Sequence, residues 1–235
     1  MGKSKDLATG ETRFVNTAGD TMTGNLQSTE FVANNAGNNT NIRVQNTASG
    51  SGSSDGFVIQ NATNSKVFLW NYENSDVLFG TNSIERLKID ASGRVTMPSQ
   101  PSFAAGVSAN NWSTSSAADA PFDTEIFDTG NNYNTSTYTF TAPVSGRYFA
   151  SIVFNRYTDS RFDIAFNVNG TNRQGAEIRT QHSSNSWKIE DFQTILNLAA
   201  NDTVKARITG VDSQGSAFFD GNGTYYDVFS MHLLG

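Results

Sequence analysis

The sequence predicts an all-β protein, and three observations support this prediction. Asn, Ser, Thr and Gly fill the spaces between short apolar runs, and these residues favour turns over helix interiors. In residues 161–169, RFDIAFNVN, apolar and polar side chains alternate with the period of two that a half-buried strand requires. No segment of the sequence shows the 3.6-residue apolar period of an amphipathic helix.

The composition excludes several classes of protein. The 235 residues carry a net charge of -6 and no cluster of Lys and Arg, so nucleic acid is not an expected partner. The absence of cysteine excludes disulfides, thiolate metal sites and cysteine nucleophiles. No apolar run reaches the roughly 20 residues that cross a bilayer, so we expect no membrane insertion.

A domain boundary is predicted at residues 97–101, MPSQP, where two of the four prolines lie. Upstream of it, short apolar islands alternate with polar spacers that are rich in turn-forming residues. The islands are residues 42–44, 57–59, 67–72, 77–79, 84–89 and 95–97. One chain has few apolar residues for a core here, so we expect several identical chains to share one in a thin, β-rich shaft.

Downstream of the boundary, the alternation is more regular. Three runs place their apolar side chains on one face: Phe162, Ile164, Phe166 and Val168; Phe192, Thr194, Leu196 and Leu198; and Val204, Ala206 and Ile208. Residues 148–154, YFASIVF, are apolar on both faces, which predicts a second sheet on one side and a neighbouring subunit on the other. Many short strands at regular spacing predict a sandwich or jelly roll.

Residues 101–235 resemble the jelly roll of the complement C1q and tumour-necrosis-factor-like family. The Phe-x-x-Pro-x-x-Gly-x-Tyr-Phe signature is matched by Phe140, Pro143, Gly146, Tyr148 and Phe149. The Leu-x-x-Gly-Asp-x-Val motif is matched by Leu198, Asp202 and Val204, with Asn201 in place of Gly. The Phe-x-Gly-x-Leu-Leu motif is matched by Phe229, Leu233 and Leu234, with Met231 in place of Gly. The resemblance implies a trimeric jelly-roll head in residues 99–235.

Two upstream stretches are similar to parts of bacteriophage fibres. Residues 15–27, VNTAGDTMTGNLQ, resemble a motif of tail fibres, and residues 85–98, ERLKIDASGRVTMP, resemble the strand-turn-strand that often precedes a fibre head. Together the resemblances imply a homotrimeric structural protein on the tail or capsid surface of a virion. Residues 1–30 would dock to other virion proteins, residues 31–98 would form the shaft, and the head would bind host-surface carbohydrate or protein.

Two alternatives remain open: a capsid head fibre or decoration protein, and a polysaccharide depolymerase. What residues 1–14 bind distinguishes a tail position from a capsid position. No enzyme is expected, because neither His182 nor His232 lies in a recognisable motif and the chain has no GxSxG elbow. The densest acidic cluster consists of Asp119, Asp123, Glu125 and Asp128. We expect these four residues to lie on a solvated strand edge rather than in a catalytic site.

No cofactor is expected, and calcium is the one metal ion left open. Residues 220–227, DGNGTYYD, offer oxygen ligands but lack the spacing and the closing Glu of a calcium loop. A turn rich in Asp, Asn and Gly accounts for them more simply.

Antiparallel alternation predicts where a ligand would bind. If the chain enters the jelly roll at its base, the turns at 142–146, 169–171 and 199–202 return to the base. The loops at 155–161, 181–187 and 211–224 then gather at the opposite end. Aromatic rings and planar polar groups in these loops suit recognition of carbohydrate or protein, whereas Phe218 and Phe219 could instead plug the top of a trimer. The candidate contacts are Tyr157, Asp159, Arg161, His182, Asn185, Trp187, Asp212, Gln214, Asp220 and Asn222.

Overall fold

The computed structural model describes residues 39–64, 66–108, 112–156, 162–178, 188–211, 217–219 and 227–235. These residues form strands and turns and contain no helix, which confirms the all-β prediction. Consequently, this part of the chain has no helix long and apolar enough to cross a membrane. The chain divides into two compact units, Met1–Ser75 and Asp76–Gly235.

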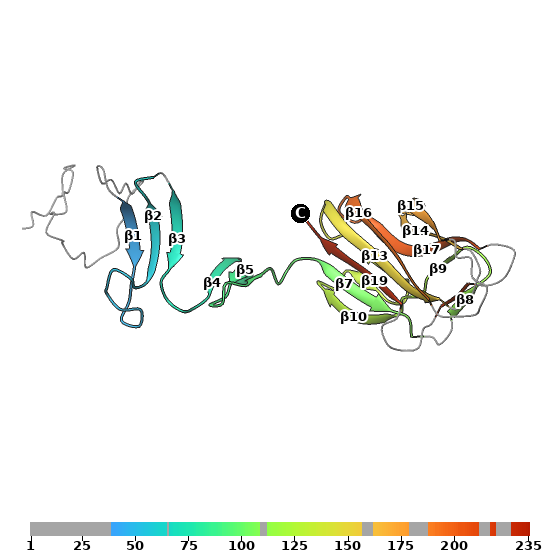
Figure 1. The fold of residues 1–235 in the computed structure, drawn as a ribbon, viewed down its shortest axis with the longest axis horizontal. Helices are drawn as coiled ribbons and strands as arrows, with labels where there is room; N and C mark the ends of the chain where they lie inside the picture. Colours follow the sequence, from blue (N-terminus) through green and yellow to red (C-terminus); the bar gives the residue numbers. More distant parts are fainter. Residues whose placement is uncertain are drawn as a thin grey trace, which may run out of the picture. The chain divides into compact units, whose positions relative to one another are not determined.

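The first unit contains a three-stranded antiparallel sheet of β1 (Thr40–Val44), β2 (Phe57–Asn61) and β3 (Val67–Asn71) (Figure 1). The register aligns Ile42, Ile59 and Leu69 in one row across the sheet. All three are exposed, whereas Val58, which points to the other face, is buried. The sheet therefore leaves one aliphatic face uncovered in the single chain.

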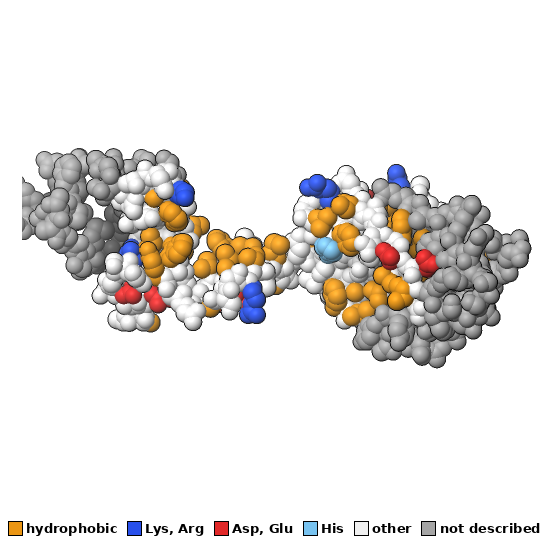
Figure 2. Space-filling model, in the orientation of Figure 1, with side chains coloured by type: hydrophobic (Ala, Val, Ile, Leu, Met, Phe, Trp, Pro, Cys, Tyr) orange, Lys and Arg blue, Asp and Glu red, His pale blue; other side chains and the backbone are white. Residues whose placement is uncertain are grey.

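The second unit begins with a three-stranded sheet of β4 (Val77–Thr81), β5 (Ile84–Ile89) and β6 (Val95–Thr96). Its register places Val77, Ile89 and Val95 in one row, with Phe79 opposite Leu87 on the same face. Figure 2 shows the band of hydrophobic side chains over this sheet. All six predicted apolar islands upstream of residue 98 contribute a strand.

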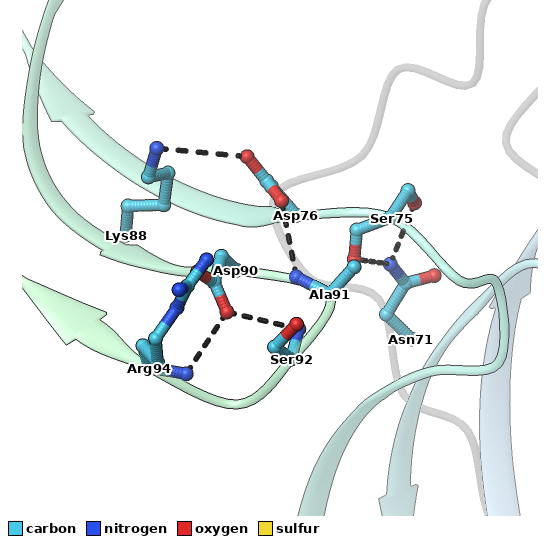
Figure 3. Close-up of polar contacts among 8 residues, drawn as sticks. All are labelled: Asn71, Ser75, Asp76, Lys88, Asp90, Ala91, Ser92 and Arg94. Carbon is cyan, nitrogen blue, oxygen red and sulfur yellow. Dashed lines mark hydrogen bonds and ion pairs between the residues drawn. The ribbon is translucent and has the colours of Figure 1, made fainter.

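A carboxylate organises the turn between β5 and β6 (Figure 3). The Asp90 side chain accepts 2.9 Å hydrogen bonds from the backbone amides of Ser92 and Arg94, and its Oδ2 lies 2.6 Å from Arg94 Nε. Hydrogen bonds from the Arg94 backbone and side chain lower the pKa of Asp90. The start of β4 joins the same turn, because Asp76 accepts a 3.1 Å hydrogen bond from the Ala91 amide.

The rest of the second unit is a sandwich of two antiparallel sheets (Figure 1). The seven-stranded sheet has the order β10-β7-β19-β13-β18-β8, with β16 paired to the other edge of β13. Its strands are β7 (Ser102–Gly106), β8 (Trp112–Thr114), β10 (Thr124–Thr129), β13 (Gly146–Arg156), β16 (Lys188–Leu198), β18 (Ala217–Phe219) and β19 (Val228–Leu233).

The six-stranded sheet has the order β11-β12-β17-β14-β15, with β9 paired to β17. Its strands are β9 (Ala118–Asp119), β11 (Tyr133–Asn134), β12 (Thr139–Thr141), β14 (Phe162–Val168), β15 (Thr171–Ile178) and β17 (Thr203–Val211). The alternation predicted for β14, β16 and β17 is confirmed. The side chains predicted to be apolar in each strand face the core, and they are less exposed than the polar side chains that alternate with them.

Aromatic side chains fill the space between the two sheets. The Phe103 ring is fully buried, and its centroid lies 4.3 Å from that of Tyr133, 4.9 Å from Phe229 and 5.1 Å from Phe140. The hydroxyl of Tyr133 donates a 2.7 Å hydrogen bond to the carbonyl oxygen of Phe122, which satisfies its polar group inside the core. Burial raises the pKa of Tyr133.

The structure accounts for the two positions where the sequence motifs lack glycine. Asn201 has a φ of 70°, a left-handed conformation that Asn adopts more readily than most other residues. Met231 lies in β19 between Phe103 and Ala150, with its side chain packed in the core. The strand therefore holds a long side chain without opening the sandwich.

Candidate functional site

The seven-stranded sheet has an outer face that points away from the core. Across β7, β19, β13 and β16, the register aligns one row of outward residues: Ser102, His232, Phe149 and Ile195. A second row contains Ala104, Ser230, Ser151 and Gln193, and a third contains Gly106, Val228, Val153 and Asp191. Small residues thus occupy the middle of this face, which allows another surface to approach closely.

Apolar side chains surround these small residues. Ile195 is 53% exposed and Phe127, opposite Ala104 on β10, is 50% exposed. Phe149 and Val153 are partly exposed, although they lie on the central strand of the sheet. Figure 2 views this face and shows hydrophobic side chains gathered on it. The two-faced apolar pattern of residues 148–154 therefore corresponds to one face inside the sandwich and one on this surface.

Hydrogen bonds join the three turns that the sequence places at the base of the jelly roll. The Ala142 amide donates to the Asp202 carbonyl at 2.8 Å, and the Asn201 amide donates to the Ala142 carbonyl at 2.7 Å. The Asn169 side-chain amide donates to Asp202 Oδ1 at 2.7 Å. The chain enters the domain at this end, since the Leu233 amide donates to the Pro101 carbonyl at 3.0 Å.

The fold, the core and the motif positions agree with one family. A family model described as the C1q domain matches residues 102–234. The chain belongs to the C1q domain family. The match covers more than half of the chain and includes both sheets of the sandwich.

Two solved structures are similar to part of this chain. The globular domain of the zebrafish complement 1qA protein is 14% identical, with a TM-score of 0.45, and the match covers 57% of this chain and 98% of that one. The Eiger TNF structure from S. frugiperda is 12% identical, with a TM-score of 0.41, and the match covers 58% of this chain and 93% of that one. Comparison with curated protein sequences finds no significant match.

The ten predicted ligand contacts of the C1q domain lie outside the described residues. The structure does describe the strand ends that flank their loops. Arg156, the last residue of β13, pairs with Lys188, the first residue of β16. Phe162, the first residue of β14, pairs with Ile178 at the end of β15 and with Val211 at the end of β17. Each pairing therefore joins strand ends that flank two of these loops.

One loop contains a strand that the sequence did not predict. The backbone of Phe218 and Phe219 forms part of β18, which pairs with β8 and places Phe219 opposite Arg156. A three-residue strand shows no clear periodicity, and its partner lies about a hundred residues earlier, so no local signal indicated it.

Only the last residue of the loop at 220–227, which was considered for calcium, is described. Asp227 is buried, and its Oδ1 accepts a 2.6 Å hydrogen bond from the Asn155 amide, so it ties β13 to the start of β19. The described residues contain no group of three or more His, Asp or Glu side chains that could hold a metal ion. Residues 220–226 are not described, and calcium binding there stays an open alternative to the turn that the sequence favours.

The four acidic residues do not lie on a single strand edge: Glu125 and Asp128 lie on the edge strand β10, whereas the prediction was wrong for Asp119 and Asp123. Asp119 pairs with Lys205 and Arg207 of β17. Asp123 accepts hydrogen bonds from the backbone and hydroxyl of Ser108 at 2.7 and 2.6 Å. Asp128 accepts a 2.7 Å hydrogen bond from the Tyr133 amide. Among these four residues, Glu125 is exposed, whereas Asp119, Asp123 and Asp128 are half-buried and each accepts a hydrogen bond from another strand or loop.

Proposed function

We propose that the protein is the subunit of a homotrimeric virion fibre whose C1q domain binds a receptor on the host surface. The observation that carries the proposal is the outer face of the seven-stranded sheet, where Phe127 and Ile195 are exposed and Phe149 and Val153 are partly exposed in the single chain. Exposed apolar patches of this kind mark interaction sites, and contacts between proteins are one such site.

The chemistry of this face favours a second copy of the chain as its partner. Fully burying a Phe, Ile or Val side chain stabilises an assembly by about 1.5–3 kcal/mol. Phe149, Val153, Ile195 and Phe127 supply such side chains, and Ala104, Ser151 and Ser230 between them present little bulk. A three-fold arrangement agrees with the resemblance of both the head and the upstream motifs to trimeric proteins.

The two upstream sheets support assembly independently of the head. In the β4-β5-β6 sheet, one face consists of Val77, Phe79, Leu87, Ile89 and Val95. Leu78, Lys88 and Thr96 form a more polar row on the other face. A three-stranded sheet needs a covered hydrophobic face for stability, and copies of the same sheet from neighbouring subunits would provide that cover.

The loops at the end of the head opposite the base turns are the proposed receptor contacts. Tyr157 and Trp187 are the leading candidates, because their rings can stack on the apolar face of a sugar or fill a pocket of a protein. In this arrangement residues 1–30 attach the fibre to a tail or capsid protein, and the head faces away from the particle.

The experiment is to replace both Tyr157 and Trp187 by Ala and measure adsorption of the particle to host cells. We expect a folded trimer that no longer adsorbs, with Thr209→Ala on the six-stranded sheet as a matched control that adsorbs normally. Unchanged adsorption of the double variant would contradict the proposed contacts. Symmetry-resolved imaging of the particle then distinguishes tail attachment from capsid attachment.

A further inference from the structure

The outward face of the six-stranded sheet carries an open, polar pocket of about 450 Å³. Its floor crosses three strands, because Asn167 of β14 pairs with Asn172 of β15 on one side and with Lys205 of β17 on the other. Asp119 of β9 lies opposite Arg207 of β17 and closes one end. None of these residues belongs to the outer face of the seven-stranded sheet.

Two cations share one carboxylate in this pocket. Lys205 Nζ lies 2.9 Å from Asp119 Oδ2, and Arg207 Nη1 donates to Asp119 Oδ1. Burial alone would raise the pKa of Asp119, but the hydrogen bonds from Lys205 and Arg207 outweigh it, so the pKa is lowered and the carboxylate stays ionised. Within the described residues, neither cation has a second carboxylate partner, so the group keeps a net charge of one positive unit.

Hydrogen-bond donors exceed acceptors in the pocket. A Lys ammonium has three N–H groups and an Arg guanidinium has five, and Asp119 engages one nitrogen of each. Asn167 Nδ2 donates to Asn172 Oδ1 at 2.7 Å, which orients both amides on the pocket floor. The side chains of Asp119, Lys205 and Arg207 are only 25%, 32% and 33% exposed, so their charges are less screened than those of free surface residues.

We infer that this pocket binds the carboxylate of an acidic sugar, a uronic acid unit of a surface polysaccharide. A carboxylate matches the planar guanidinium of Arg207 and the ammonium of Lys205, and it supplies the acceptors that the pocket lacks. The volume is far larger than an inorganic anion needs and lies in the range of small-molecule sites. The amides of Asn167 and Asn172 would then face the hydroxyls of the sugar ring.

The inference rests on the proposed function in one respect: the trimer uses the other sheet, which leaves this one open to a ligand on the host surface. The binding itself is measured without host cells. Unchanged adsorption of the Tyr157 and Trp187 variant would therefore contradict the loop contacts and leave the inference about this pocket unaffected. Absence of glucuronate binding would overturn the inference about the pocket and leave the loop contacts unaffected.

The test is isothermal titration of the full-length protein with sodium D-glucuronate, with D-glucose and sodium sulfate as comparison ligands. We expect saturable binding of glucuronate, none of glucose, and binding of sulfate at least tenfold weaker. Absence of glucuronate binding overturns the inference. Equal affinity for sulfate overturns its sugar specificity, because the pocket would then recognise charge alone.

Three variants separate a binding site from a structural ion pair. Lys205→Gln and Arg207→Gln should each weaken glucuronate binding at least tenfold. Glucuronate binding by the natural protein should also weaken as the salt concentration increases. Asp119→Asn removes the competing carboxylate and should strengthen binding several-fold, even though it also loses the ion pairs. A purely structural network predicts that all three variants lower the melting temperature and that none changes glucuronate affinity, and that result would overturn the inference.

Discussion

The ring of Phe149 lies 5.2 Å from the imidazole ring of His232, and both side chains point outward from adjacent strands of the seven-stranded sheet. His232 is exposed and Phe149 is partly exposed, so this contact holds an aromatic ring at the surface rather than in the core. A substitution of either residue should therefore affect contacts at the outer face and not the packing inside the sandwich.

Replacing Phe149 by Asp should dissociate the proposed trimer and leave the sandwich folded. The side chain makes no contribution to the inner core, whereas a carboxylate buried in each subunit contact without a partner costs several kcal/mol. Sedimentation velocity would report the mass, and circular dichroism would report the fold. Thr209→Asp, on the outward side of β17, is the matched control and should remain trimeric. A trimeric Phe149→Asp protein would exclude this face as the subunit contact.

Replacing Phe103 by Ala should lower the free energy of unfolding by about 3–5 kcal/mol, because it opens a cavity where four aromatic rings meet. Denaturant titration of the head fluorescence measures the change. Val144→Ala is the control, since Val144 is 45% exposed in a turn, and it should change the free energy by less than about 0.5 kcal/mol. Similar losses in both variants would show that Phe103 is not central to the core.

Acid should destabilise the turns at the base of the head. Hydrogen bonds from the Asn169 side chain and the Ala199 amide lower the pKa of Asp202 below its ordinary value of about 3.9. Because the folded-state pKa lies below the unfolded-state pKa, the stabilisation is complete above about pH 4 and disappears as the pH falls through the folded-state pKa.

The Asp202→Asn variant tests this pH dependence. Its melting temperature should lie below that of the natural protein at about pH 6, and the two should converge towards about pH 2.5. Melting curves recorded across this range provide the measurement. Parallel curves with a constant separation would mean that Asp202 contributes through packing and not through its charge.

Replacing Ile89 by Asp should make residues 76–98 sensitive to protease. Ile89 lies between Val77 and Val95 in the apolar row of the β4-β5-β6 sheet, which the neighbouring subunits cover in the proposed shaft. Limited proteolysis followed by mass spectrometry locates the cuts. Thr96→Asp, on the opposite face beside Lys88, should remain as resistant as the natural protein. Equal resistance of both variants would argue against assembly through the apolar face.

The sequence predicted those parts of the fold that depend on local patterns. Alternation with period two indicated β14, β16 and β17, because each strand buries one face against the same core. Clusters of turn-forming residues indicated where the six upstream strands begin and end, because turns also depend on residues that are adjacent in the sequence. The left-handed conformation of Asn201 also agrees with the motif, since Asn replaces Gly at a position that requires a positive φ.

Long-range pairings could not be predicted in this way. Asp119 is 88 residues before Arg207 in the chain, and only the pairing of two-residue β9 with β17 brings them together. Its neighbours in the sequence, Asp123 and Asp128, find different partners, so a cluster in the sequence becomes three separate structural contacts. The charged pocket follows from this topology and has no signature in the local sequence.

Sedimentation equilibrium of the full-length protein tests the assembly most directly. We expect three times the chain mass of 25.4 kDa and no folded monomer on dilution through the micromolar and nanomolar range. The circular dichroism signal of the strands should be lost whenever the mass falls. A stable, folded monomer of 25.4 kDa would contradict the proposed trimer.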